Sequence, residues 1–254
     1  MDFVAKRDLA ARAARAAGNQ MMKNAKDAAV FDKARHDVVT TMDLANENLL
    51  RDLLLAACPQ DGFLGEETGT VEGREGMWIV DPIDGTNNFV HRLPYYVISV
   101  AWQFRGELCA GAVYNPVTGE MFCAAKGSGA YLNGKPIHVT GVDDPNHALI
   151  NFSFGMRQQA DFERTVRGIA KMGDVADFRR LGSAAYECCL VACGKSDGFF
   201  ERGLHVYDFG AGAVILREAG GTVTGWPGEE DFLTTGNLLA SNGKMHPYLT
   251  ACLA

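Results

Sequence analysis

The chain has 254 residues, of which 47% are apolar and 22% charged. This composition is typical of a globular protein and excludes a disordered, collagen-like or coiled-coil chain. A chain of this size can bury roughly 70% of its unfolded surface, so it needs no metal or disulfide merely to fold. Its 24 basic and 31 acidic residues give a net charge of −7, which provides no general attraction for nucleic acid.

The first half of the chain is predicted to form two helices and then an antiparallel sheet. Apolar residues at helical spacing, among them Ala13, Ala17 and Met21, predict a first helix over residues 2–31. A second helix is expected to follow residues 41–43 and to end at Pro59. The predicted strands are residues 77–80, 95–104, 108–114 and 120–125. Asn133 and Gly134 then predict a tight hairpin.

In the second half, strands alternate with helices, which predicts a layered α/β unit with a mixed sheet. The predicted strands are residues 148–154, 177–181, 198–201, 221–225 and 237–241. The predicted helices are residues 158–172, 184–193 and 209–219 and a final helix at the end of the sequence. We therefore expect two domains, residues 1–141 and 142–254, with any functional site in the crevice between them.

The cysteines and the apolar runs predict the location of the protein in the cell. Seven cysteines are scattered among apolar residues without a C-x-x-C pair, which indicates reduced core residues of a cytoplasmic protein. The longest strongly apolar runs, residues 53–58 and 95–104, are much shorter than the ~20 residues of a spanning helix. We therefore expect no membrane-spanning segment.

The run WIVDPIDGTNNF, residues 78–89, carries the most informative chemical pattern. A short apolar strand ends in Asp81 and Asp84, and the proline between them turns the chain so that both carboxylates can face one spot. Gly85 and Thr86 open a short helix whose free N–H groups face the same spot. Carboxylates beside such amides are compatible when a cation lies between them, and an oxygen-only ligand set favours magnesium over zinc. By itself the pattern also fits a tight turn capped by Asp81.

Two further acidic segments accompany this pattern. Glu66 lies in a Gly-Glu-Glu sequence, residues 65–67, directly after apolar residues. Asp208 begins a helix rich in glycine and alanine, where an acidic residue is often only a helix cap. Four carboxylates that converged without a counter-charge would repel one another by about 4 kcal/mol per close pair at an effective dielectric of 20. A converging set would therefore include divalent cations.

Together these segments resemble the inositol monophosphatase family. The resemblance rests on the sequence at residues 65–67, on WIVDPIDGTNNFVHRLP from residue 78 and on GLHVYDFGAGAVILREAGG from residue 203. It covers nearly the whole chain and implies an αβαβα layered sandwich like that of fructose bisphosphatase. It also implies magnesium-dependent hydrolysis of a phosphomonoester by direct attack of metal-activated water. Two to three Mg²⁺ ions per site, a homodimer and sensitivity to lithium would accompany this activity.

The resemblance assigns roles residue by residue. The implied metal ligands are Glu66, Asp81, the backbone carbonyl of Ile83, Asp84 and Asp208. The implied catalytic residues are Asp43 and Thr86, which would orient the attacking water, and Glu66, which would help to hold a third ion through water. The implied substrate contacts are the Gly85 and Thr86 amides for phosphate, Gly182, Ser183 and Ala184 in the pocket, and Glu201 for an inositol hydroxyl.

Two features leave questions within this resemblance. Tyr207 stands directly before Asp208, where the family usually has tryptophan, so the packing behind this ligand is expected to differ. Lys33 or Arg35 matches a basic residue that family members place near the site, and the sequence does not choose between them.

Three functions remain open from the sequence. Residues 89–94 and Glu201 favour hydrolysis of inositol monophosphate, a small phosphorylated polyol. The same chemistry could act on a nucleotide 3′-phosphate, a sugar bisphosphate or histidinol phosphate. A third hypothesis is a regulatory binding protein that retains phosphatase activity, since some bacterial members of the family act with the transcription machinery. The net charge of −7 argues against direct contact with nucleic acid.

Overall fold

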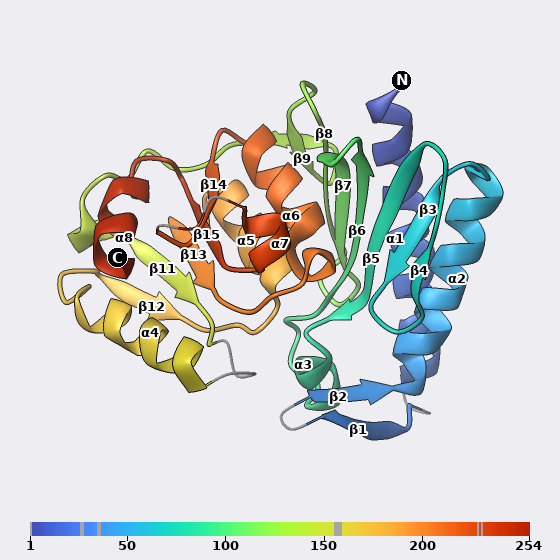
Figure 1. The fold of residues 1–254 in the computed structure, drawn as a ribbon, viewed down its shortest axis with the longest axis horizontal. Coiled ribbons are helices and arrows are strands. Elements are labelled where there is room, and N and C mark those ends of the chain that lie inside the picture. Colours follow the sequence, from blue (N-terminus) through green and yellow to red (C-terminus); the bar gives the residue numbers. More distant parts are fainter. Residues whose placement is uncertain (1, 26–27, 35–36, 155–158, 228, 230) are drawn as a thin grey trace.

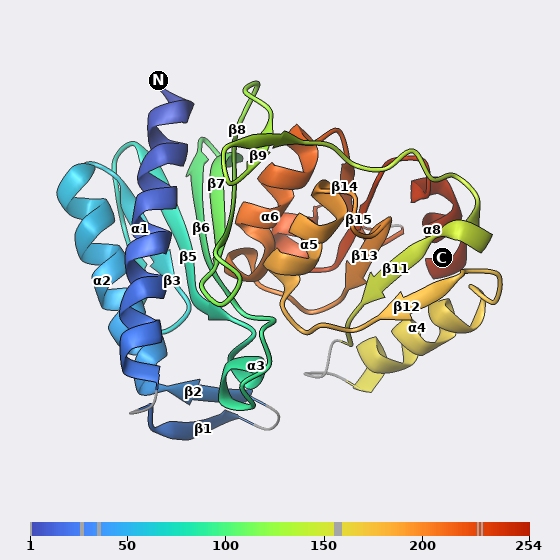
Figure 2. The same cartoon turned by 180° about the vertical axis from the view of Figure 1, so that it is seen from behind.

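Helices and sheets alternate in five layers. The computed structural model describes residues 2–25, 28–34, 37–154, 159–227, 229 and 231–254. The layers, in order, are helices α1 (Phe3–Asn24) and α2 (Thr41–Ala57), an eight-stranded sheet, helices α5 (Ala184–Ala192) and α6 (Val206–Glu218), a five-stranded sheet, and helices α4 (Gln159–Ala170) and α8 (His246–Leu253). Figures 1 and 2 show this order from opposite sides. The predicted αβαβα sandwich is confirmed.

The larger sheet lies in the first half of the chain. Its strand order is β10-β9-β8-β7-β6-β5-β3-β4. The strands are β3 (Gly62–Gly65), β4 (Gly69–Val71), β5 (Gly76–Asp84), β6 (Val97–Phe104), β7 (Glu107–Asn115), β8 (Glu120–Ala125), β9 (Ala130–Leu132) and β10 (Lys135–Ile137). The prediction of a purely antiparallel sheet is wrong at one pair, because β3 runs parallel to β5. The predicted hairpin is present, with positive φ at Asn133 and Gly134.

The first helix is shorter than predicted. Helix α1 ends at Asn24, and residues 30–40, beyond its end, contain the hairpin of β1 (Val30–Ala34) and β2 (Asp37–Thr40). The buried apolar stripe of α1 stops at Met21, so the packing that stabilises this helix weakens near its end at Asn24. Val30 and Phe31 are exposed, at 47% and 56%, and β-branched and aromatic residues favour the extended chain.

The five-stranded sheet belongs to the second half and is mixed, as predicted. Its order is β12-β11-β13-β15-β14. The strands are β11 (Leu149–Phe152), β12 (Asp177–Arg179), β13 (Gly198–Glu201), β14 (Thr222–Gly225) and β15 (Leu238–Ser241). The sequence did not predict two short helices, the 3₁₀ helix η2 (Pro145–His147) and α7 (Phe232–Thr235). The short helix α3 (Thr86–Val90) follows β5, as predicted.

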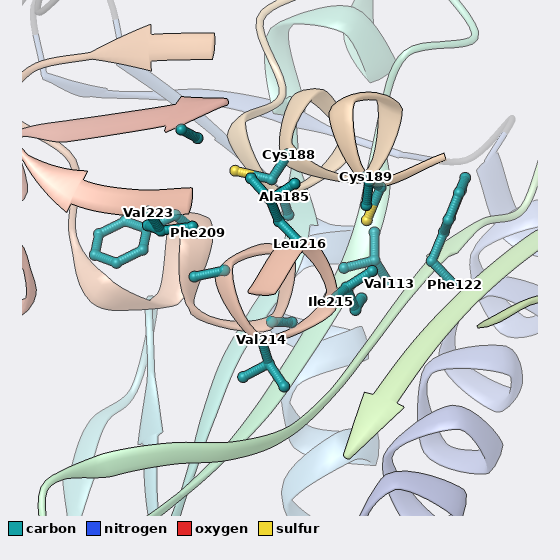
Figure 3. Close-up of a cluster of buried hydrophobic side chains, with 14 of the residues drawn as sticks. Val113, Phe122, Ala185, Cys188, Cys189, Phe209, Val214, Ile215, Leu216 and Val223 are labelled. Carbon is teal, nitrogen blue, oxygen red and sulfur yellow. The ribbon is translucent and has the colours of Figure 1, made fainter. Parts of the chain in front are cut away.

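One apolar core joins the two halves of the chain. Helices α5 and α6 pack against each other, and their buried side chains contact strands from the large sheet. Figure 3 shows Val113 and Phe122 of that sheet beside Cys189 and Ile215 of the helices. The site residues of the two halves are therefore held together by a continuous hydrophobic interface. The domain boundary at residue 141 stays a prediction.

All seven cysteines are free thiols, as predicted. Cys109, Cys188, Cys189 and Cys252 are buried. No helix within the described part of the chain is long and apolar enough to cross a membrane.

Candidate metal-binding active site

The end of strand β5 positions two of the predicted metal ligands. β5 pairs with β6 as far as Asp81, and the register shifts before pairing is found again at Asp84. Pro82, between them, has no N–H to donate to the ladder, which accounts for the break. Asp81 and Asp84 are buried, at 2% and 7% exposed. Their charges interact, so the irregular strand end brings two carboxyl groups close together.

Gly85 links this strand to helix α3. Its backbone is left-handed, with φ +95°, and an added Cβ would lie 2.8 Å from the carbonyl oxygen of Tyr95. Both the conformation and the space therefore require glycine. Because the first amides of a helix have no carbonyl partner within it, the predicted phosphate contacts, Gly85 and Thr86, stand where free donors are available.

Asp81 is at the electrostatic centre of the predicted ligand set. Burial raises the pKa of its carboxyl group well above the usual range, and the negative charges of Glu66, Asp84 and Asp208 raise the pKa further. Glu66 lies in the turn between β3 and β4, whereas Asp208 lies in the first turn of α6. The structure thus brings together four carboxyl groups from three separate segments.

The chemistry of these donors fits a hard divalent cation, because all four are carboxylates without imidazole or thiolate. Within the described residues, no three histidine, cysteine or acidic side chains are arranged to hold one ion as they stand. A carboxylate oxygen that accepts one hydrogen bond still has lone pairs for a cation. The residues therefore fit Mg²⁺ by composition and charge.

Asp84 is held by the second half of the chain. Its Oδ2 accepts hydrogen bonds from the Ser183 hydroxyl at 2.7 Å and the Ala185 amide at 2.7 Å, and its Oδ1 accepts one from the Ala184 amide at 3.1 Å. Burial raises the pKa of Asp84 to about 6, and these hydrogen bonds oppose the increase. Ser183 is the N-cap of α5, so the predicted substrate residues Ser183 and Ala184 directly contact a predicted metal ligand.

Asp208 acts as a helix cap and also lies in the acidic cluster. Its Oδ2 accepts a hydrogen bond from the His205 amide at 2.6 Å, which closes a capping box at the start of α6. Its charge also raises the pKa of Asp81 and of Glu201. The two interpretations of Asp208 from sequence, cap and site residue, are therefore compatible. The neighbouring ring of Tyr207 stacks on His205, with 4.9 Å between ring centroids.

Asp43 and Thr86 are in contact, as the predicted water-orienting pair requires. The Thr86 hydroxyl lies 3.2 Å from Asp43 Oδ1 and 2.9 Å from the carbonyl oxygen of Ile83. Asp43 Oδ2 accepts from the amide and hydroxyl of Thr40, at 2.7 and 2.6 Å, at the start of α2. Burial raises the pKa of Asp43 to about 6, although the hydrogen bonds from Thr40 lower it.

Glu201 lies within the electrostatic field of the same cluster. Burial raises the pKa of its carboxyl group well above the usual range, and the charges of Glu187, Asp208 and Asp84 add to the effect. Burial raises the pKa of Glu187 to about 8. Glu187 Oε1 accepts from the Leu181 amide at 3.1 Å, and among the described residues Oε2 has no hydrogen-bond partner. Glu187 therefore belongs to the wall behind the predicted pocket.

Sequence reasoning missed three residues that support the site. Glu187 is a single acid in the apolar segment AAYECCLVA, and that isolation was the available signal. Asn88 joins the halves through its Nδ2 atom, 2.7 Å from the carbonyl oxygens of both Tyr95 and Leu181. Glu47 is fully buried beside the turn that carries Glu66.

The predicted basic residue near the site is not placed. Arg35 lies outside the described residues, and Lys33 lies in β1 with its side chain outside the description. The choice between them stays open.

Comparison with known proteins agrees with the geometry. A model of the inositol monophosphatase family matches residues 5–254. The chain belongs to this family. Among characterised relatives, it is 39% identical over 241 residues to the Nus factor SuhB of Vibrio cholerae, covering 92% of this chain and 90% of that protein. It is 36% identical to the Nus factor SuhB of Escherichia coli K12, covering 94% and 91%.

Solved structures of the inositol monophosphatase family have the same fold. The extragenic suppressor protein suhB of Bartonella henselae superposes with a TM-score of 0.93 at 31% identity, covering 98% of both chains. An inositol monophosphatase from Anabaena gives 0.88 at 30% identity, covering 100% of this chain and 96% of the other. The family thus contains similar proteins named as enzymes and similar proteins named as Nus factors.

Proposed function

We propose that this protein is a magnesium-dependent phosphomonoesterase. The observation that carries the proposal is the electrostatic interaction of Asp81 with Glu66, Asp84 and Asp208. Such a cluster is unfavourable without a cation, and its all-oxygen composition suits Mg²⁺. We assign these four side chains and the carbonyl of Ile83 to two or three ions per site.

Bound magnesium would lower the pKa of a water molecule and stabilise charge on the leaving oxygen of the ester. The Thr86 hydroxyl can donate its single proton to Asp43 or to Ile83, but not strongly to both. If the Ile83 carbonyl held a cation, as the proposal assigns, the Thr86 hydroxyl would donate to Asp43. The lone pairs of Thr86 Oγ1 are then free to accept from water and to orient it for direct in-line attack.

The favoured substrate is inositol monophosphate, which would be split into inositol and phosphate. The amides of Gly85 and Thr86 would receive the phosphate group, at the start of α3. Gly182, Ser183 and Ala184 would line the pocket, and a carboxyl oxygen of Glu201 would accept hydrogen bonds from a ring hydroxyl. The alternative substrates are a nucleotide 3′-phosphate, a sugar bisphosphate and histidinol phosphate.

Phosphate release from a panel of these four esters, with and without Mg²⁺, tests the proposal. Turnover is expected only with Mg²⁺ and to be fastest with inositol monophosphate. Asp84→Asn is expected to abolish turnover while the fold persists, because the amide oxygen can still accept from Ser183 and Ala185. Retained turnover in this variant, or a phosphoryl-enzyme trapped with radiolabelled substrate, would contradict the mechanism.

A regulatory binding role is a second candidate function. The observation that favours it is the similarity, at 36–39% identity, to proteins named Nus factor SuhB. Co-purification from cells with wild type and with Asp81→Asn distinguishes the two roles. A protein partner retained equally by both would support binding independent of catalysis, and an absence of any retained partner would argue against it.

Three further properties belong to the same proposal. We expect a homodimer, inhibition by lithium and a cytoplasmic location. Sedimentation equilibrium tests the dimer, and phosphate release at increasing Li⁺ concentration tests the inhibition. Microscopy of a tagged chain tests the location.

A further inference from the structure

Helix α2 presents three buried polar side chains to the rest of the molecule. Asp43, Asn46 and Glu47 are 1%, 0% and 0% exposed. Their spacing places them on one face of the helix. Asp43 contacts Thr86, and Asn46 Nδ2 lies 3.4 Å from the carbonyl oxygen of Pro82. This face of α2 therefore contacts the same strand end that carries the predicted metal ligands.

Glu47 contacts the neighbouring segment, the turn between β3 and β4. Its Oε2 accepts from the Glu67 amide at 2.8 Å, and its Oε1 accepts from the amide and hydroxyl of Thr68 at 2.7 and 2.5 Å. Gly65 pairs with Gly69, so residues 66–68 form the whole turn. Three donors satisfy a buried carboxylate whose burial would otherwise be costly.

Glu47 also contacts the residue that precedes this turn. A Cβ built on Gly65 would lie 2.3 Å from Glu47 Oε1, a distance that no side chain tolerates. The carboxyl group of Glu47 thus touches the backbone directly before and directly after Glu66. These contacts hold the backbone on both sides of Glu66.

We propose that Glu47 is a positioning residue that holds Glu66 in the acidic cluster around Asp81. The inference rests on the proposed function, because positioning matters only if the cluster binds a cation. Residues behind metal ligands typically change metal affinity 10–100-fold when they are replaced. A merely structural role, the attachment of α2 to the sheet, would instead change stability and leave cation affinity unaltered.

Glu47→Gln is the main test. An amide has one oxygen, so the N–H group of Glu67 or of Thr68 must lose its acceptor. Binding of Mn²⁺ is measured by the loss of the free-ion paramagnetic resonance signal, and turnover is measured against Mg²⁺ concentration. We expect the Kd for Mn²⁺ to rise about tenfold or more, with turnover at saturating Mg²⁺ within a few-fold of wild type.

A milder pair of variants keeps the test valid if Glu47→Gln folds poorly. Thr68→Val removes only the hydroxyl donor to Glu47, whereas Thr68→Ser keeps it. The Kd for Mn²⁺ is expected to rise two- to five-fold in Thr68→Val, by the size of a weak hydrogen bond, and to remain near wild type in Thr68→Ser. Equal Kd values in the two variants would overturn the inference.

Glu218→Gln is the matched control. Glu218 accepts from three consecutive loop amides, those of Gly127, Ser128 and Gly129, at 2.9, 3.1 and 2.9 Å. It stands ten residues after Asp208 on α6, about 15 Å along the helix. This variant is expected to lower the melting temperature and keep the Kd for Mn²⁺.

Two further results would overturn the inference: an unchanged Kd in Glu47→Gln, or an equal rise in Glu218→Gln. A wild-type protein that binds Mn²⁺ but hydrolyses none of the esters would contradict the proposed function alone, because the Kd comparison would still decide the role of Glu47. A wild-type protein that binds no Mn²⁺ would overturn both.

Discussion

The two halves of the molecule contribute different parts to the candidate site. The first half contributes most of the predicted metal ligands, among them Asp81 and Asp84 at the end of β5. The second half contributes Asp208 and also the beginnings of α5 and α6, where backbone N–H groups are free of helical partners. Asp84 accepts hydrogen bonds from the start of α5, across the junction between the halves. The negative charge of one half is thus partly compensated by donors of the other.

Asp81 and Asp84 differ in whether they accept hydrogen bonds from the second half of the chain. Asp84 receives bonds from Ser183, Ala184 and Ala185. Asp81 accepts a hydrogen bond from the amide of Ile83, two residues further along the chain, at 2.9 Å. The negative charges of three other acids raise its pKa. Two neighbouring carboxyl groups therefore differ in their need for a cation, and Asp81 has the greater need.

Asp81→Asn should have the largest effect, and in opposite directions on activity and stability. Turnover should fall at least 10³-fold, because a central ligand is lost. Without metal the melting temperature should rise by a few degrees, because a buried, repelled charge is removed while the amide oxygen keeps the Ile83 hydrogen bond. Phosphate release and calorimetry in EDTA measure the two effects.

Asp61→Asn provides the contrast. Asp61 is also buried, but it pairs with Lys6 and accepts from the Trp102 indole at 2.9 Å. Removing its charge should lower the melting temperature, since breaking one partner of a buried ion pair costs about 3–5 kcal/mol. Turnover at 25 °C should persist. A lower melting temperature for Asp81→Asn in EDTA would show that Asp81 is compensated as Asp61 is.

The pH dependence of turnover should report Asp43 in the first half. Burial raises its pKa to about 6, and the ionised carboxylate is the stronger acceptor for the Thr86 hydroxyl, so kcat should fall below that pH by up to tenfold per unit. Bound cations favour the ionised form and would move the inflection to lower pH. The profile of kcat at saturating Mg²⁺ between pH 4.5 and 8 measures it. An identical inflection in the residual turnover of Asp43→Asn would exclude this assignment.

The sequence predicted the parts of the site that lie within continuous motifs. Asp81 and Asp84 are three residues apart at the end of an apolar run, a pattern that local rules mark as a candidate pair. Asp208 starts a helix, where local rules favour a cap, and the family resemblance assigned its site role. Glu47 and Glu187 could not be found in this way. Their partners are the turn at residues 66–68 and the amide of Leu181, and such contacts depend on how helices pack on distant loops.

The fold shows the same limit. The strands β8 and β13 have the predicted bounds, because alternating or continuous apolar runs mark strands directly. The parallel pairing of β3 with β5 was missed. Strand β3 has only four residues, which is too short to give a clear pattern, and tertiary packing determines which strand pairs with it. The β1–β2 hairpin was missed because the helical pattern of α1 was extended beyond its last buried residue, Met21.

Glu187 in the second half should make stability depend on pH. Its pKa is about 8 in the folded protein and about 4.5 when unfolded, so the folded state holds a proton that the unfolded state releases. Its contribution to stability is full below pH 4.5 and is lost as pH rises through 8. Glu187→Gln should remove this loss, so its free energy of unfolding should exceed that of wild type at pH 8 by a few kcal/mol.

Urea unfolding of wild type and Glu187→Gln at pH 5, 6.5 and 8 measures this difference. The amide keeps an oxygen for the Leu181 N–H group, so the variant preserves the hydrogen bond of Oε1. A difference between the two proteins that is the same at all three pH values would show that Glu187 is ionised in the folded state.

Ser183→Ala should have the smallest effect and tests the link between the halves. The hydroxyl of Ser183 donates to Asp84 at 2.7 Å and lowers its pKa. Its loss should cost about 1.5–3 kcal/mol of unfolding free energy, as expected for a hydrogen bond to a charged group. Ser196→Ala removes a buried neutral hydrogen bond, in which Asn151 Nδ2 donates to the Ser196 hydroxyl oxygen at 3.2 Å, and should cost about 1 kcal/mol. Urea unfolding in EDTA at pH 8 compares the two variants. The larger loss is expected at Ser183, because this pH lies above the pKa of Asp84, about 6, and the acceptor is then ionised. Equal losses would mean that Asp84 is protonated without metal and that the second half does not compensate its charge.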